Sequence, residues 1–170
     1  PPPPPPPPRP PPRSPTLRGE ELLTWRNSSA VAAKSLQFHL YYNAWRNSRS
    51  TWMRELQYVA GTAGTASRDE SDWGWIDVTS LRLIRSGPPL DATSRLRFIA
   101  PDDGNGEDRT VAEVPLDTPV GPGETINVRI TWSTRVPRTF ARTGVIGDYY
   151  FLAQWFPKIG VFEDTGWNCH

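Results

Sequence analysis

The stretch that decides the fold is TINVRITWS, residues 125–133, because its side chains alternate strictly between apolar and polar. The apolar side chains share one face of an extended strand: Ile126, Val128, Ile130 and Trp132. The polar side chains share the other face: Asn127, Arg129 and Thr131. Since successive side chains of a strand point to opposite faces, this pattern predicts a β-strand with one buried face. The preceding segment 119–123, PVGPG, is typical of a turn.

Residues 35–42 show the same alternation and predict a second strand of this kind. Its apolar face would carry Leu36, Phe38, Leu40 and Tyr42, and its polar face would carry Gln37, His39 and Tyr41. Strands are also predicted at residues 19–26, 75–84, 95–99 and 110–114. The last two flank segment 101–108, which contains Asn105-Gly106 and is typical of a hairpin loop. Short alternating strands separated by Gly and Pro predict an all-β, antiparallel sandwich.

One helix is predicted, over residues 47–60. Trp52, Leu56 and Val59 recur at helical spacing, and either Ser50 or Thr51 is suited to cap its start. Residues 61–72 are polar and rich in Gly, Thr and Ser, so they predict a loop.

The chain begins with a proline tract, residues 1–15, which predicts a disordered, polyproline-type linker because proline lacks a backbone donor. An alternative reading is an SH3-type ligand, since Pro8, Pro11 and Arg13 fit a PxxPxR pattern. Residues 16–170 then form one domain of ordinary size. The absence of an initiator methionine indicates that the chain is part of a longer protein.

The charge of the chain is nearly balanced, with 19 Lys and Arg against 18 Asp and Glu and a net charge of +1. This balance argues against nucleic acid as a partner, although it leaves room for a local basic site. No apolar run approaches the roughly 20 residues that cross a bilayer, so no membrane segment is expected. The localisation stays open.

Catalytic and metal-binding motifs are missing from the sequence. Its only histidines are His39 and His170, and it has no HExxH, GxSxG or phosphate-loop pattern. The acidic, Gly-rich segment 102–108 contains residue types that bind calcium, but the same types form tight turns, which is the reading favoured here. The single cysteine, Cys169, is expected to be an ordinary small residue and not a reactive thiol.

The segment GDYYFLAQWFPKIGVFEDTGW, residues 147–167, carries seven large aromatic rings. A single strand cannot bury so many rings on its own sheet, and each can bury about 150–250 Å². We therefore expect some of them to remain exposed on the isolated chain and to contact another domain.

Five motifs in order resemble the N-terminal domain of the aminopeptidase N-like zinc metallopeptidases. They are Gly19-Glu20 with Trp25-Arg26-Asn27-Ser28; LQFHLYYNAWRN at 36–47; Pro122-Gly123-Glu124 before the strand at 125–132; Pro137 through Arg142 and Gly144; and Trp155-Phe156-Pro157 with Asp164, Gly166 and Trp167. The resemblance covers residues 16–170.

The resemblance implies a saddle-like, mostly antiparallel β-domain that precedes a zinc-binding catalytic domain outside this chain. On this reading the chain is a non-catalytic fragment that packs on the catalytic domain and walls the peptide cleft. Its catalytic residues and zinc ligands would lie outside the chain, and Gln154 is the candidate contact to the amine of the peptide substrate. The alternative is a stand-alone β-sandwich module that binds carbohydrate or protein.

Overall fold

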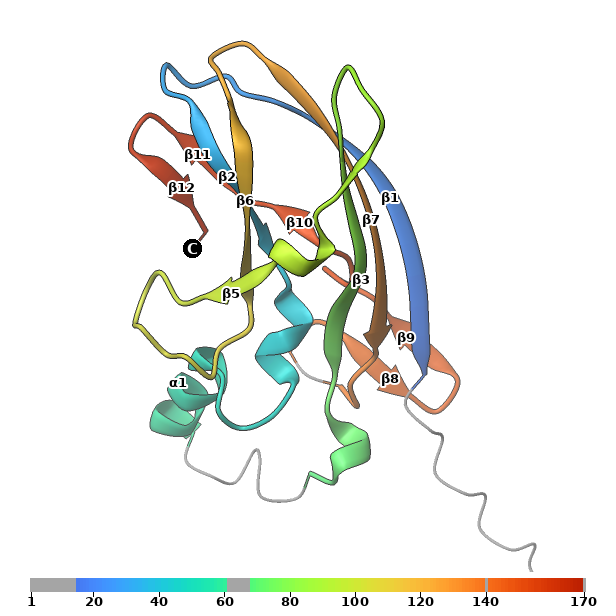
Figure 1. The fold of residues 1–170 in the computed structure, drawn as a ribbon. Coiled ribbons are helices and arrows are strands. Elements are labelled where there is room, and N and C mark those ends of the chain that lie inside the picture. The colour runs from blue at the N-terminus through green and yellow to red at the C-terminus, as the bar shows by residue number, and fades with distance from the viewer. Residues whose placement is uncertain (1–14, 61–67, 140, 170) are drawn as a thin grey trace, which may run out of the picture.

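The computed structural model describes residues 15–60, 68–139 and 141–169. Two four-stranded antiparallel sheets face each other (Figure 1). The first sheet has the order β1 (Thr16–Arg26), β7 (Thr125–Arg135), β3 (Trp75–Ile84), β4 (Leu90–Asp91). The second has the order β10 (Lys158–Ile159), β2 (Ala33–His39), β6 (Val111–Val120), β5 (Arg97–Ile99). The predicted all-β antiparallel sandwich is confirmed. The predicted linker 1–15 lies, apart from Pro15, outside the described residues.

Strand β7 lies between β1 and β3 in the first sheet, and it has the one buried face that its alternating sequence predicts. It pairs with β1 along residues 16–26 and with β3 along residues 75–84. Its apolar face is buried: Ile126, Val128 and Ile130 are inaccessible to solvent and Trp132 is 4% exposed. This face packs into the core with Leu36 and Phe38 of the opposite sheet.

The strand predicted at residues 35–42 ends earlier than its alternation indicates. Strand β2 stops at His39, and Tyr41–Trp45 forms a 3-10 turn. The Asn43 side chain holds this turn, because it donates to the Arg109 carbonyl and accepts from the Ile76 amide. The polar face that the alternation assigns to His39 is not exposed at this residue, since the His39 ring is buried and stacks on Tyr41 with 4.7 Å between ring centroids.

Helix α1 (Thr51–Ala60) is shorter than the predicted 47–60. Ser50 caps it: its Oγ accepts the Met53 amide at 3.2 Å. Among the described side chains of this helix, Met53 is the fully buried one, whereas Val59, which shares the helical spacing of Trp52 and Leu56, is 88% exposed. Of the predicted loop 61–72, residues 61–67 lie outside the described part, and Glu70–Asp72 forms a 3-10 turn.

The end of the chain covers one side of the sandwich. Strand β10 pairs with β2, and β11 (Val161–Glu163) forms a hairpin with β12 (Gly166–Asn168). The Trp25 ring of β1 lies 5.9 Å from Phe162 and 5.4 Å from Trp167, so this hairpin closes over the edge of the first sheet.

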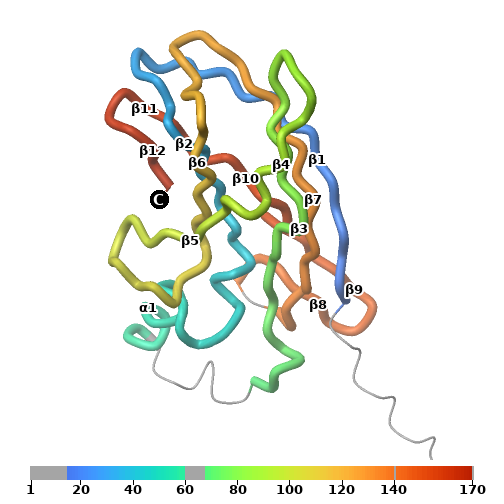
Figure 2. The backbone as a smooth tube through the Cα atoms, viewed as in Figure 1, coloured from blue at the N-terminus to red at the C-terminus, as the bar shows by residue number. Residues whose placement is uncertain are grey.

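A second hairpin, β8 (Gly144–Ile146) and β9 (Tyr149–Phe151), lies at the end of the first sheet, near the start of β1 (Figure 2). The last short helical turn, Thr93–Arg95, follows β4. Among the described residues, no helix is both long and apolar enough to span a bilayer.

Candidate functional site: the aromatic hairpin β8–β9

The aromatic segment divides into a buried half and an exposed half. Trp155, Phe162 and Trp167 pack against the core. Tyr149, Tyr150 and Phe151 of β9 are instead 69%, 47% and 51% exposed. Other exposed apolar side chains lie in the same segment, and we call the whole set, which includes both faces of β9, the hairpin surface: Ile146, Tyr149, Tyr150, Phe151, Leu152 and Phe156. The expectation that some rings stay exposed is thus confirmed for the hairpin surface.

A buried threonine fixes the hairpin to the sandwich. Thr143 is 2% exposed, and its hydroxyl lies 2.5 Å from the hydroxyl of Tyr42, a fully buried core residue. The same oxygen bonds the Phe151 carbonyl at 3.0 Å and accepts the Ala153 amide at 3.3 Å. The turn Gly147-Asp148 joins the strands, and Gly147 supplies the positive φ of 57° that this turn requires. The hairpin surface therefore rests on a rigid base.

Gln154, the predicted substrate contact, directly follows this base. Its backbone has a φ of 56°, in the left-handed region that non-glycine residues rarely adopt. Both neighbours are held in place, since Ala153 bonds Thr143 and the Trp155 carbonyl accepts the Thr134 hydroxyl at 3.0 Å. The Gln154 side chain is half-buried and forms no hydrogen bond to another described residue. Strain at a fixed position with an uncommitted amide is a feature of functional residues.

A hollow of about 390 Å³ adjoins the hairpin. It is lined by Thr139, Ala141, Arg142, Thr143, Gly144, Ile146, Tyr149 and Phe151. Gln154 is not among the lining residues, so the structure does not place the predicted contact in this hollow. The hollow is mainly apolar, with the Arg142 side chain as its charged group.

Comparison of the chain with protein-family models, with curated proteins and with solved structures found no match.

The described residues do not supply a zinc site. They contain no group of three or more His, Cys, Asp and Glu side chains placed to hold a metal ion. His39 is buried against Tyr41 on the second sheet. Residues 15–60, 68–139 and 141–169 thus do not fit a zinc ion, and no chemical step of this chain is derived through one.

The acidic segment 102–108 has a structural role. Asp103 accepts the Thr51 hydroxyl at 2.7 Å and Asp108 accepts the Thr51 amide at 2.9 Å. The buried Asn105 donates to the Arg49 carbonyl at 3.0 Å. These bonds attach the loop to the start of α1 and engage the side chains that calcium would need. The turn reading of this segment is therefore preferred over a calcium site.

Cys169 is buried beside Gln37, with 3.4 Å between Sγ and Oε1. Burial, followed by the nearby charge of Asp102, raises the pKa of the Cys169 thiol to about 11. The thiol is therefore protonated at neutral pH and is a poor nucleophile, in agreement with its predicted role as an ordinary residue.

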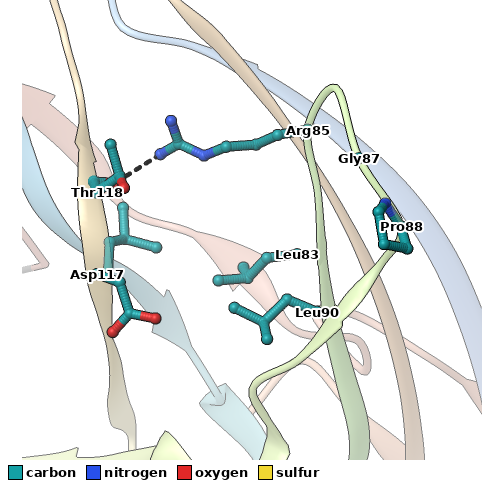
Figure 3. A pocket seen from close by; sticks show the side chains of 8 residues that line it. Leu83, Arg85, Gly87, Pro88, Leu90, Asp117 and Thr118 are labelled. Atoms are coloured by element: carbon teal, nitrogen blue, oxygen red, sulfur yellow. Dashed lines mark hydrogen bonds between the residues drawn. The ribbon is translucent and has the colours of Figure 1, made fainter.

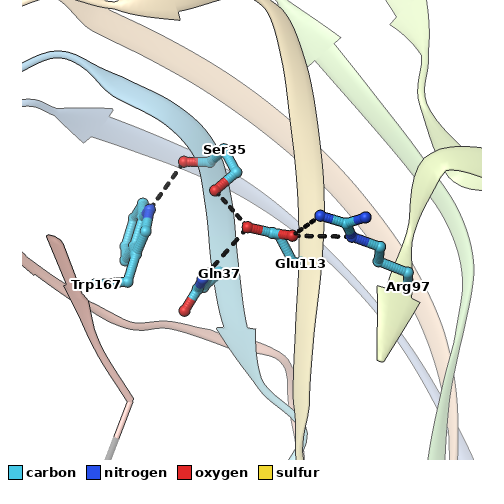
Figure 4. Close-up of polar contacts among 5 residues, drawn as sticks. All are labelled: Ser35, Gln37, Arg97, Glu113 and Trp167. Carbon is cyan, nitrogen blue, oxygen red and sulfur yellow. Dashed lines mark hydrogen bonds and ion pairs between the residues drawn. The ribbon is translucent and has the colours of Figure 1, made fainter. Parts of the chain in front are cut away.

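A cluster of hydrogen-bonded polar side chains on the second sheet attaches the β11–β12 hairpin (Figure 4). Glu113 accepts the Ser35 hydroxyl at 2.8 Å and is bonded by Arg97, while the Trp167 indole donates to the Ser35 carbonyl at 3.0 Å. Every polar member of this group is bonded within it, so its arrangement indicates a structural function.

A smaller hollow of about 180 Å³ lies where the β3–β4 turn approaches β6 (Figure 3). Leu83 and Leu90 form its apolar side, and the Arg85 guanidinium crosses it to donate to the Thr118 carbonyl at 2.7 Å. Arg85 thereby satisfies a backbone acceptor of β6, which indicates protection of a sheet edge.

Sequence reasoning missed Thr143, although this residue positions the hairpin. No local pattern could have found it, because its three partners lie 8 to 101 residues away along the chain.

Proposed function

We propose that this chain is the non-catalytic N-terminal β-domain of an aminopeptidase N-like zinc metallopeptidase. In this proposal the domain packs against the catalytic domain of the parent protein and forms one wall of the peptide cleft. The chain alone hydrolyses no peptide, because the metal ligands and the general base belong to the other domain.

The observation that carries the proposal is the hairpin surface. It gathers four aromatic rings and two aliphatic side chains within residues 146–156, each at least 37% exposed. Soluble proteins rarely leave apolar patches larger than a few hundred Å² in water, and larger ones mark contact sites. A covering protein surface removes these rings from water, and a neighbouring domain is the partner that the sequence resemblance implies.

The attachment of the hairpin to the sandwich supports a role as a rigid side of the cleft and not as a mobile segment. Thr143 bonds it to Tyr42 in the core, and Trp155 packs on Trp132 with 5.7 Å between ring centroids. A surface fixed in this way loses little conformational freedom when it is covered. Gln154, at the edge of this surface, offers an amide oxygen that suits the ammonium group of a peptide.

The experiment compares this chain with a longer protein. The longer protein also contains the residues encoded after His170. Amide hydrogen exchange is measured by mass spectrometry on residues 144–156 in both. We expect slower exchange of the hairpin in the longer protein, an HExxH motif in the added sequence, and peptide hydrolysis by the longer protein only.

A matched pair of variants tests whether the hairpin surface binds a hydrophobic probe more strongly than an exposed apolar side chain elsewhere does. Phe151→Ser lies in the hairpin surface, and Val161→Ser removes a similarly exposed apolar side chain from β11. In the isolated chain, Phe151→Ser should lower binding of a hydrophobic dye and Val161→Ser should not. Equal exchange of the hairpin in both proteins, or an extension without HExxH, would overturn the proposal. Either outcome would instead support the alternative, a stand-alone module that binds carbohydrate or protein.

A further inference from the structure

The outer face of the first sheet places two arginines side by side. In the pairing of β3 with β7, Arg82 lies directly opposite Arg129, and both side chains point away from the core. Like charges directly opposite each other on one face of a sheet repel. Such a pair is stable only if other charges or solvent offset the repulsion.

The carboxylates of the sheet offset this repulsion in part. Glu20 of β1 accepts from Arg129 at 2.7 Å, with both side chains about half-exposed. Arg82 forms no hydrogen bond or ion pair with the residues that the structure describes, and its nearest acidic partner in register is Asp91 of β4. The pKa of Asp91 is lowered chiefly by hydrogen bonds from Thr93, with the charge of Arg82 as the smallest contribution. Most guanidinium donors of the pair are therefore available to a ligand.

The two arginines border a hollow of about 480 Å³ on this face. It is lined by Glu20, Ser80, Arg82, Ile84, Pro89, Arg129 and Thr131. Ser80 and Thr131 are themselves opposite each other in the neighbouring row, so two hydroxyl groups stand beside the two guanidinium groups. The Thr131 hydroxyl is also hydrogen-bonded to the Thr79 hydroxyl at 3.1 Å, which leaves Ser80 as the hydroxyl with more capacity for a ligand. Paired strands hold all four side chains, which gives the arrangement a fixed spacing.

We propose that this hollow binds a doubly charged tetrahedral oxyanion of the phosphate type between Arg82 and Arg129. A guanidinium presents a planar fork of donors that matches the oxygen atoms of such a group, and hydroxyls complete its coordination. A single carboxylate neutralises one arginine, as Glu20 already does for Arg129. An oxyanion held between the two guanidinium groups offsets the positive charge that Glu20 leaves and reduces the repulsion between Arg82 and Arg129. The site does not depend on the function proposed above.

The test titrates inorganic phosphate into the chain at constant ionic strength and follows the backbone amide signals of β3 and β7 by NMR. We expect saturable shifts centred on residues 80–82 and 129–131. Arg82→Ala should weaken binding about tenfold, as expected for the loss of a hydrogen bond to a charged group. Glu20→Gln should strengthen binding, because it releases the Arg129 guanidinium.

Arg18→Ala is the matched control. Arg18 is exposed on the same face, but its partner in β7 is Ser133, about 13 Å along the strand from Arg129. This variant removes the same charge and should change the affinity less than about twofold, by screening alone. Equal weakening by Arg18→Ala and Arg82→Ala would show non-specific attraction and would overturn the proposal, as would shifts that do not saturate.

A second titration, with a phosphoserine peptide and its serine counterpart, distinguishes the source of the phosphate group. Tighter binding of the phosphopeptide than of inorganic phosphate would assign the hollow to a phosphorylated protein. Equal binding would assign it to the free anion, and both results support the site.

Discussion

The indole of Trp132 lies directly over Gly19, its partner in the pairing of β7 with β1. A Cβ atom at residue 19 would approach three atoms of this ring to less than 3.0 Å, closer than real Cβ contacts. The indole also packs on Trp155, with 5.7 Å between ring centroids, so a shift of the indole would disturb this second contact. The glycine on β1 is therefore required by the size of the side chain opposite it.

Gly19→Ala should destabilise the fold by about 1–3 kcal/mol, the usual range for overpacking a filled core. Urea unfolding followed by tryptophan fluorescence measures this change. Gly106→Ala is the control, because nothing lies within 4 Å of a Cβ at that position. Combining Gly19→Ala with Trp132→Leu should destabilise less than the sum of the single changes. Strict additivity would mean that the two residues do not compete for space.

Glu21 should make the stability depend on pH in the opposite sense to most carboxylates. It faces inward from β1, and burial raises its pKa from 4.5 to about 7. The folded state thus holds a proton that the unfolded state has already lost. The free energy of unfolding should therefore fall as the pH rises from about 4.5 to 7 and then level off.

Glu21→Gln removes the penalty of the buried charge. Because the group is only half-buried, solvent screening reduces the expected gain at pH 8 to about 1 kcal/mol, with none at pH 4. The comparison is between urea unfolding curves at the two pH values. Glu55→Gln, a change at an exposed site of α1, should show no such difference. A gain of equal size at pH 4 and pH 8 would assign the effect to packing.

The contribution of Glu113 to stability should depend on pH with the sign that is usual for carboxylates. Burial alone would raise its pKa, but hydrogen bonds from Arg97, Ser35 and Gln37 outweigh burial and lower it. Its stabilising contribution should be present above pH 4.5 and be lost as the pH falls through the lowered value. Glu113→Ala should cost about 1–2 kcal/mol at pH 7, because three donors lose their acceptor. Thermal unfolding from pH 7 to pH 3 checks both points, and an unchanged pH profile would contradict them.

The variant Gln154→Gly tests whether the positive φ of residue 154 costs stability or whether its side chain contributes to packing. Glycine adopts a φ of 56° without penalty, so this change should stabilise the fold by about 1 kcal/mol. Ala153→Gly, at the adjacent position, is the control and should destabilise it by a similar amount. If Gln154→Gly lowers the stability, the side chain is a structural element. If the longer protein is the peptidase proposed above, a rise in its KM with stability retained would support the substrate contact.

Alternation of side chains predicted the strands well because most inward positions of this sandwich are apolar. Strand β3 has the predicted bounds of 75–84, and β7 extends only two residues beyond 133. The bounds of the others were less accurate: β1 begins three residues before the predicted 19, β5 begins two residues after the predicted 95, and β6 continues six residues beyond the predicted 114. The strand predicted at 35–42 is too long because a distant contact overrode the local pattern. Residues 41 and 42 leave the strand because Asn43 bonds to Arg109 and Ile76, and nothing in segment 35–42 reports these partners.

The candidate site was less accessible to sequence reasoning. The density of rings in residues 147–167 predicted that some would be exposed, but not which, since burial depends on what lies across the sandwich. Trp155 packs on Trp132, whereas Tyr149 belongs to the two-stranded β8–β9 hairpin and is 69% exposed. The facing pair Arg82 and Arg129 is visible only once the register of β3 against β7 is known.

The pairing of β1 with β7 also sets the order in which the molecule can assemble. Residues 16–26 find their partners only at 125–135, so the first strand emerges from the ribosome long before the strand that fixes its register. Closing so long a loop is slow, and contacts of this separation are characteristic of domains that fold in milliseconds to seconds. During that interval the apolar side of β1 is uncovered. Until β7 arrives, this uncovered side is a potential contact for a second copy of the chain.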